Sequence, residues 1–206
     1  LPGNTGFLMD QAVLEMRVGE MRTADQLCAD VLEIDPKNTR AMMLRADLAE
    51  MSDMSDISVE RLQEVINQTQ DTLLRSRLRV RMANRCSVIA KRKPGLYTDD
   101  FILDQIRLAI EENPAEVGTI SLYAEKCLQA KRYAESKKWA VHVLEKHNRH
   151  NIRAKIALFE LALVEQRYDD AEQILHDRYI NYDPTDPLRY YFLARLYTAS
   201  GDYQEA

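Results

Sequence analysis

The sequence has little glycine and proline, and it lacks long apolar runs. Six glycines and six prolines occur among 206 residues, and alternating runs of valine, isoleucine and threonine are scarce. Alanine, leucine, glutamate, arginine and glutamine are abundant instead, and these residues favour helices. No apolar run approaches the roughly 18 to 20 residues that a membrane-spanning helix needs. The sequence therefore predicts an all-α, soluble segment with no membrane insertion of its own.

The chain also lacks targeting and redox motifs. Its opening residues, LPGNTGFLMD, have neither the basic nor the apolar region of a signal peptide. We expect a fragment of a longer protein, because the chain does not begin with methionine and ends inside a repeat, so its localisation stays open between cytoplasm and bacterial periplasm. Cys28, Cys86 and Cys127 form no Cys-x-x-Cys pair and fall among apolar residues of expected helices. We expect them to be buried free thiols.

An internal period is the clearest feature that is present. The segments KRYAESK, QRYDDAE and SGDYQEA place Tyr133, Tyr168 and Tyr203 at intervals of 35 residues. Self-similarity at a fixed period of this length is typical of a repeat array, in which each repeat buries its apolar face against its neighbours.

The last repeat carries a recognisable spacing. Tyr190, Leu193, Ala194 and Tyr197 follow W-x2-L-G-x2-Y, and Ala206 comes nine residues after Tyr197. Here the chain resembles the tetratricopeptide repeat (TPR) family, whose unit is a pair of antiparallel helices of about 34 residues. The resemblance implies an α-solenoid, a right-handed superhelix whose inner surface is lined by the first helix of each pair.

The same register divides residues 1–206, taken as a single TPR array, into about six repeats. We expect them at residues 5–38, 39–70, 71–116, 117–151, 152–186 and 187–206, the last one truncated. The fifth repeat departs from the pattern, because Lys155 stands where a large apolar residue is usual and Phe159 where a small one is usual. The second and third diverge more, with helices expected near 58–70 and from about 71 to 91.

The sequence shows no catalytic motif. It has no glycine-rich phosphate loop, no His-Glu-x-x-His and no nucleophile elbow. His142, His147 and His150 cluster around EKHNRHN without a fixed ligand motif, so we interpret them as solvated turn histidines, with a metal site as the alternative. The acidic pairs at 99–100 and 169–170 stand at expected helix starts and are interpreted as caps. We expect no enzyme activity, no cofactor and no metal.

Charge is distributed unevenly. Residues 72–98 contain eight lysines and arginines and no acid, so this segment carries +8, while the chain as a whole has a net charge of −5. On a helix, Leu74, Leu78, Met82 and Cys86 recur every fourth residue as a buried stripe. Five arginines flank this stripe and are called here the arginine ladder: Arg75, Arg77, Arg79, Arg81 and Arg85.

Two interpretations of the arginine ladder stay open. Guanidiniums spaced about 6 Å apart along a helix suit the carboxylates or phosphates of an anionic partner. Alternatively, the arginines pair with acids on adjacent helices, with Asp47, Glu50, Glu60 or Glu64 as candidates, or cover apolar surface with their stems. The anionic-partner hypothesis predicts that replacing Arg77 and Arg81 by glutamate leaves helicity nearly unchanged and abolishes partner capture.

The resemblance to TPR proteins implies a non-catalytic scaffold that holds a peptide or helix of a protein partner in its concave groove. Some family members grip the carboxylate of chaperone tails with lysine and asparagine at the fifth and ninth places of the first helices. Those places here hold other residue types, with Ser121 and Ile156 among them, so we expect a different partner. The candidate groove residues are Met43, Asp47, Glu125, Glu160, Tyr191 and Arg195.

A second hypothesis places the array in the periplasmic part of a bacterial exopolysaccharide export protein, in the cell envelope, where it would contact polysaccharide or a modifying enzyme. RNA binding ranks third, because a sequence pI near 5.5 disfavours a nucleic-acid partner. We also expect that such a fragment can self-associate through the apolar face exposed at its truncated repeat.

Overall fold

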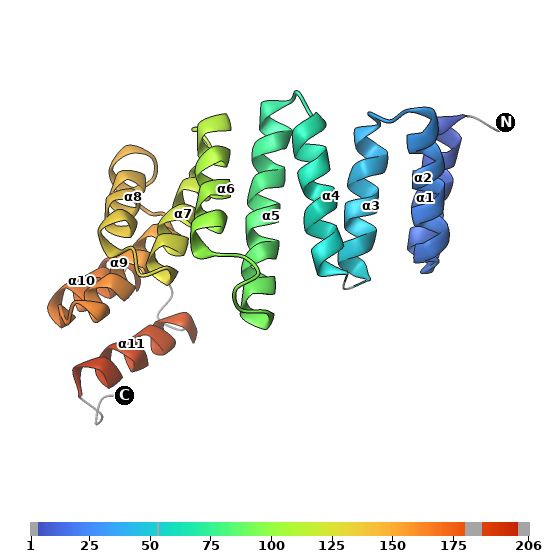
Figure 1. The fold of residues 1–206 in the computed structure, drawn as a ribbon. Coiled ribbons are helices and arrows are strands. Elements are labelled where there is room, and N and C mark those ends of the chain that lie inside the picture. Colours follow the sequence, from blue (N-terminus) through green and yellow to red (C-terminus); the bar gives the residue numbers. More distant parts are fainter. Residues whose placement is uncertain (1–3, 53, 180–186, 202–206) are drawn as a thin grey trace. The chain divides into compact units, whose positions relative to one another are not determined.

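The computed structural model describes residues 4–52, 54–179 and 187–201, and these residues form helices and short connections only (Figure 1). The predicted all-α class is confirmed for this part of the chain. The chain divides into two compact units, Leu1–Pro114 and Ala115–Ala206. None of the described helices is long and apolar enough to cross a membrane.

The described residues of the first compact unit form six helices, and each lies mainly against its neighbours in sequence. They pair as helical hairpins, α1 with α2, α3 with α4 and α5 with α6, and the hairpins stack side by side (Figure 1). The bounds are α1 (Thr5–Val18), α2 (Met21–Ile34), α3 (Thr39–Met51), α4 (Ser55–Gln68), α5 (Thr72–Arg92) and α6 (Asp99–Glu112).

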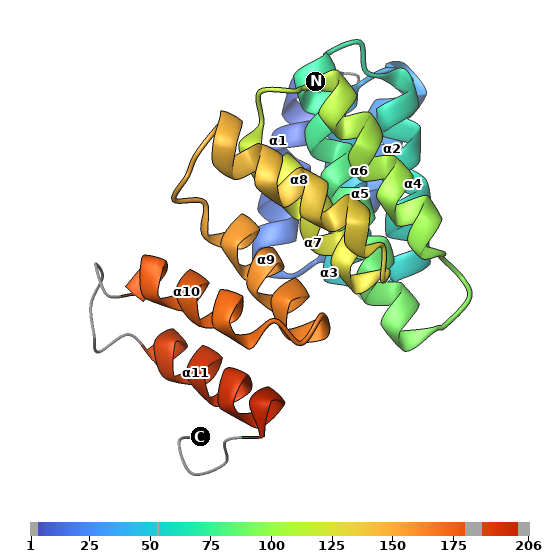
Figure 2. The same ribbon diagram turned by 90° about the vertical axis from the view of Figure 1, so that its left-hand side faces the viewer.

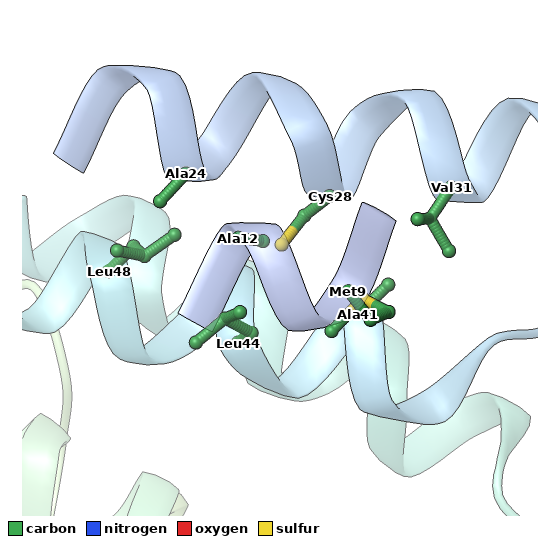
Figure 3. Close-up of a cluster of buried hydrophobic side chains, with 8 residues drawn as sticks. All are labelled: Met9, Ala12, Ala24, Cys28, Val31, Ala41, Leu44 and Leu48. Atoms are coloured by element: carbon green, nitrogen blue, oxygen red, sulfur yellow. The ribbon is translucent and has the colours of Figure 1, made fainter. Parts of the chain in front are cut away.

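The core at the start of this unit is built largely from small residues. Ala24, Cys28 and Val31 of α2 point toward α1 and α3 (Figure 3). Ala12 of α1 and Ala41 of α3 are fully buried, and these short side chains let the helix backbones approach closely. The complete cluster is Met9, Ala12, Ala24, Cys28, Val31, Ala41, Leu44 and Leu48.

The second compact unit continues the hairpin pattern (Figure 2). Helix α7 pairs with α8 and α9 with α10, while α7 also lies against α9, and α10 against α11. The bounds are α7 (Val117–Gln129), α8 (Tyr133–Lys146), α9 (Ile152–Val164), α10 (Tyr168–Tyr179) and α11 (Pro187–Ser200).

Phe159 shows how this unit accommodates a large residue where the repeat pattern favours a small one. Its side chain is buried and meets Phe192 of α11 edge to face, with ring centroids 5.3 Å apart. Ala162 and Ala171 of the same cluster are small, so they leave room for the large side chain of Phe159. The unusual residue is therefore part of the core between α9, α10 and α11.

Side-chain caps mark five of the helix starts. Asn4, Asn38, Asp71, Thr98 and Asn151 accept hydrogen bonds from backbone amides of the first turn, which satisfies donors that have no partner within the helix.

Some boundary expectations need correction. The helix expected near 58–70 is α4, which starts at Ser55 and ends at Gln68, whereas the long helix expected from about 71 to 91 is confirmed as α5. The acids at 99–100 and 169–170 lie in the first turns of α6 and α10, but the cap of α6 is Thr98, whose Oγ lies 3.2 Å from the amide nitrogen of Phe101. Pro184, Tyr203 and Ala206 lie outside the described residues.

Candidate functional site: a groove on the second compact unit

A groove of about 880 Å³ opens between the first helices of two successive hairpins. Helices α7 and α9 form its walls, and the turn between α8 and α9 closes one side. The lining residues are Gly118, Ser121, Glu125, Leu128, Gln129, Asn148, His150, Asn151, Ile152, Arg153, Ile156, Ala157 and Glu160.

A smaller hollow of about 510 Å³ shares Glu160 with the groove. It lies between α9 and α11 and is lined by Glu160, Leu163, Val164, Tyr191, Ala194, Arg195, Thr198 and Ala199. Both depressions lie within the second compact unit. The groove lies between α7 and α9, and the hollow lies between α9 and α11.

The charged residues of the groove and the hollow pair with one another across the helices. Arg153 Nε lies 3.1 Å from Glu125 Oε2, and Arg195 pairs with Glu160. The Arg195 guanidinium also lies 5.9 Å from the centre of the Tyr191 ring, within reach of a cation–π contact. Each acid is thus paired with an arginine of a later helix, Arg153 on α9 or Arg195 on α11, and the surface carries little net charge.

Glu160 is the most enclosed of these charged groups. Burial raises the pKa of its carboxyl above the usual value, and the charge and hydrogen bond of Arg195 oppose that rise. Loss of the arginine would leave a half-buried carboxylate without this compensation, which is costly in free energy. Arg195 therefore favours the ionised form of Glu160 and offsets part of the effect of burial between α9 and α11.

Apolar side chains stand exposed among these pairs. Ile152 is 52% exposed in the groove, and Val164 and Tyr191 are about as exposed in the hollow. Leu128 and Ile156 are half-buried on the groove walls. Exposed aliphatic and aromatic groups in a concave setting are typical of binding sites for other molecules.

The structure brings together four of the six groove residues that the sequence suggested. Glu125 and Glu160 line the groove, and Glu160, Tyr191 and Arg195 line the hollow. Met43 and Asp47 lie on α3 of the first compact unit.

Arg153 was missed by sequence reasoning. It is the second residue of α9, next to the buried Ala154, and only the proximity of α7 reveals its contact with Glu125. The period was the available signal, because Arg153 follows Gly118 by 35 residues and the two therefore hold equivalent places in successive repeats. In the structure, the carbonyl oxygen of Gly118 lies 3.5 Å from Arg153 Nη1.

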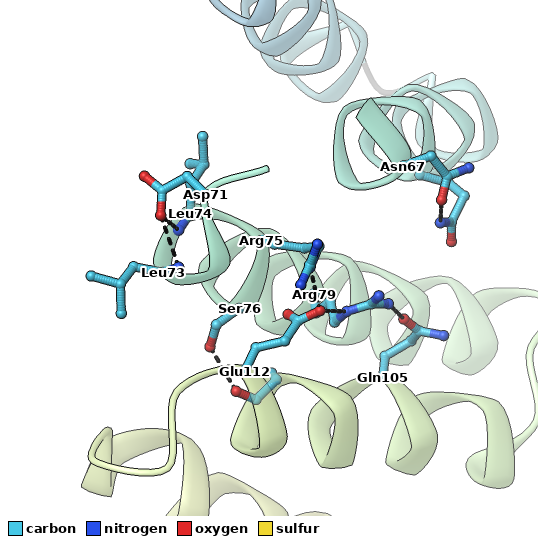
Figure 4. Close-up of polar contacts among 11 residues, drawn as sticks. Asn67, Asp71, Leu73, Leu74, Arg75, Ser76, Arg79, Gln105 and Glu112 are labelled. Atoms are coloured by element: carbon cyan, nitrogen blue, oxygen red, sulfur yellow. Dashed lines mark hydrogen bonds and ion pairs between the residues drawn. The ribbon is translucent and has the colours of Figure 1, made fainter. Parts of the chain in front are cut away.

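The arginine ladder on α5 contacts acids on both flanks. Toward α6, Arg75 Nε and Arg79 Nε lie 2.5 and 2.9 Å from the same oxygen of Glu112, and Arg79 also donates to Gln105 (Figure 4). Glu112 was not among the expected partners. It faces α5 because the hairpin turn brings the end of α6 back beside the start of α5, where Ser76 donates to the carbonyl of Ala109.

Toward α3, the ladder meets two of the acids that the sequence suggested. Arg81 lies 2.5 Å from Asp47 and from Glu50, and Arg85 lies 3.6 Å from Glu50. Arg77 is exposed on α5. Four of the five arginines therefore contact carboxylates of this chain, which favours the structural interpretation of the ladder; the anionic-partner hypothesis stays a prediction.

Comparison with known proteins agrees with this architecture at the level of fold. The sequence matches no protein-family model and no curated protein. A tetratricopeptide repeat protein from Parabacteroides merdae superposes with a TM-score of 0.79 at 14% identity, over 97% of this chain and 75% of that one. YrrB, described as a TPR protein with an unusual peptide-binding site, gives 0.66 at 14% identity over 89% of each chain. PilF of Pseudomonas aeruginosa gives 0.64 at 15% identity over 98% and 86%.

These similarities define the class of protein, a helical-hairpin repeat protein. The chain has the tetratricopeptide repeat fold, and the resemblance inferred from the spacing around Tyr190 is confirmed. At identities this low the comparison speaks for the fold alone.

Proposed function

We propose that this chain is a non-catalytic scaffold that holds a segment of a protein partner in the groove between α7 and α9. The observation that carries the proposal is the groove itself, about 880 Å³ in volume, with exposed Ile152 among paired charges. The peptide-binding site named for YrrB, which shares the fold, supports the same kind of occupant.

The lining chemistry suits a peptide better than a charged small molecule. Ile152, Ile156 and Leu128 offer apolar contacts for the side chains of a bound segment. Asn151 accepts a hydrogen bond from Ala154 through its side-chain oxygen, which leaves its amide hydrogens as donors for the carbonyls of a bound backbone. The balanced pairs Glu125–Arg153 and Glu160–Arg195 provide no net charge that would select a strongly acidic or basic ligand.

The test uses a displayed library of random peptides selected on the intact chain. Selected peptides are expected to lose binding to Ile152→Asp, because the change places a carboxylate on the apolar wall of the groove. Leu73→Asp on α5 is the matched control, since Leu73 is 50% exposed and Ile152 is 52% exposed. Peptides that bind both variants equally, or a library that yields no binder, would contradict the proposal.

We retain the six-repeat division at 5–38, 39–70, 71–116, 117–151, 152–186 and 187–206 as part of this proposal. Its support is that each of the first five ranges contains two described helices, which gives five hairpins ahead of α11. The alternative role in exopolysaccharide export, with its polysaccharide contact and envelope location, has no support among the similar structures.

A further inference from the structure

Two histidines meet at the end of α8. His142 lies on the helix, and His147 is the residue that follows it. Their Nε2 atoms are 3.3 Å apart, and the ring centroids are separated by 5.2 Å. Both side chains are exposed, so a solute can reach the two nitrogens.

A row of aromatic rings supports His142 from inside the fold. Trp139 meets His142 edge to face at 5.7 Å and Tyr123 of α7 at 5.6 Å. Tyr123 is buried, and its hydroxyl donates to Glu135 at 2.8 Å. The imidazole of His142 therefore packs on a ring row that is anchored in the core, which limits the positions that it can take.

The distance between the two nitrogens matches the distance between two ligand atoms on one metal ion. Zinc binds imidazole nitrogen at about 2.0 to 2.1 Å with tetrahedral angles, which places two such nitrogens about 3.3 to 3.4 Å apart. A right-angled arrangement at the same bond length would bring them to about 2.9 Å. We propose that His142 and His147 form a bis-histidine site for a divalent transition metal of zinc-like geometry, with water or an outside ligand completing the coordination.

The position of the pair also favours a cation. The carboxyl end of a helix carries a partial negative charge, because its last carbonyl groups have no partner within the helix. His147 sits at this end of α8, and its own amide donates to the carbonyl of Val143. A metal bound there would link the last turn of α8 to the residue after it.

Competing ligands elsewhere in the described chain are poorly suited. Cys28, Cys86 and Cys127 are buried, and burial raises the pKa of their thiols to about 11, 12 and 12, so the metal-binding thiolate is scarce. Among the described residues no group of three or more potential ligands gathers. The pair His142–His147 is therefore the strongest candidate, and the interpretation of these two residues as solvated turn histidines stays the alternative.

The chain contains one tryptophan, and Trp139 adjoins the proposed site, so its fluorescence reports on binding. Ni²⁺ is expected to quench Trp139 in a saturable manner, and equilibrium dialysis is expected to show one Zn²⁺ per chain that competes with the quenching. The double variant His142→Gln with His147→Gln is expected to lose both signals. His150→Gln and His176→Gln are matched controls that remove other exposed histidines and are expected to retain them.

Two results would overturn the site. The first is the absence of saturable Zn²⁺ binding to the unaltered chain, which would leave the histidines as a hydrogen-bonded pair. The second is equal Zn²⁺ binding by the double variant, which would place the metal elsewhere. Both histidines are exposed, so circular dichroism should show the variants folded and keep either result interpretable.

Discussion

At the scale of single residues, the turns inside the hairpins carry the period most directly. Lys131 and Gln166 both have φ of 59°, and Gly201 has φ of 87°. These residues are spaced at 35: Lys131 and Gln166 follow α7 and α9, the first helices of their hairpins, and Gly201 follows α11. The left-handed conformation costs a residue with a Cβ about 1–2 kcal/mol, whereas glycine adopts it without strain.

This strain gives a stability prediction. Lys131→Gly and Gln166→Gly are each expected to stabilise the chain by about 0.5 to 1 kcal/mol, because relief of strain exceeds the entropy that glycine loses on folding. Ala130→Gly is the control, since Ala130 has φ of −79° and its replacement should destabilise. Urea unfolding measures all three; a loss of stability in both turn variants would show that their side chains contribute contacts that outweigh the strain.

At the scale of helices, acids and arginines link successive hairpins with a constant direction. In each of four links within the described residues, the acid lies on the first helix of a hairpin, and the arginine lies on the first helix of the next hairpin or, in the last link, on α11. The links are Asp10–Arg40, Asp47–Arg81, Glu125–Arg153 and Glu160–Arg195. Exposed ion pairs contribute little to the free energy of unfolding, so we expect the more enclosed pairs to contribute most of the stabilisation.

Asp25 illustrates a different, three-helix link. It lies on α2 and binds Arg45 of α3 and Arg61 of α4 at 3.0 and 2.9 Å. Burial would raise the pKa of its carboxyl, but the hydrogen bonds and charges of the two arginines outweigh burial and lower it. A lowered pKa means that the ionised form stabilises the fold above the unfolded pKa, near 3.9, and that this stability is lost as pH falls through the folded value.

Asp25→Asn is therefore expected to destabilise by about 1 to 2 kcal/mol at neutral pH, because two arginines lose a charged partner. The difference from the unaltered chain should shrink as pH falls from about 4 through the lowered pKa of folded Asp25, where the aspartate itself becomes protonated. Asp10→Asn is the control, since Asp10 and Arg40 are both well exposed and a loss under about 0.5 kcal/mol is expected. Thermal unfolding across pH measures both, and a difference that persists in acid would refute the charge explanation.

The arginine ladder supports a second prediction at this scale. Arg79→Glu is expected to destabilise by about 3 kcal/mol, because it opposes the enclosed Glu112 with a like charge. Arg77→Glu on the same helix should change stability by less than about 0.5 kcal/mol, since Arg77 is exposed. Replacing Arg81, which pairs with Asp47 and Glu50, should also destabilise the chain, whereas the anionic-partner hypothesis predicts nearly unchanged helicity for the pair Arg77 and Arg81. Similar losses for Arg77→Glu and Arg79→Glu would contradict this assignment.

At the scale of the whole molecule, the chain divides into two compact units, and we expect damage to the core of one unit to be felt mainly in that unit. Repeat arrays are stabilised by contacts between neighbouring repeats, so distant repeats are only weakly coupled. Trp139 lies in the second compact unit and reports on its unfolding. Leu48 and Phe159 are buried in the first and second units.

Phe159→Ala is expected to cost about 3 to 5 kcal/mol and to shift the tryptophan-detected unfolding transition. Leu48→Ala is expected to cost about 2 to 5 kcal/mol and to appear as an earlier loss of helical circular dichroism, with the tryptophan transition nearly unmoved. Denaturation followed by both probes tests this. Coincident shifts in both probes for both variants would show that the two units unfold as one cooperative body.

The sequence by itself determined the helical class, the period of 35 and the buried thiols. Helix propensity and caps act over a few residues, and the repeated apolar spacing around Tyr190 needs no knowledge of distant contacts. The departures at Phe159 and in the second and third repeats were also visible, although α4 begins earlier than its expected start because the serines around position 55 leave several starting points open.

Only the tertiary structure decided which side chains meet. Glu112 rather than Glu60 or Glu64 binds the ladder, since α6 folds back along α5. Arg153 reaches Glu125 because α9 lies beside α7. The Nε2 atoms of His142 and His147 lie 3.3 Å apart because His142 is on α8 and His147 caps the carboxyl end of the same helix. A charge or an imidazole can pair with any suitable group that the fold brings within a few ångströms, and helix packing and the turns between helices select that group.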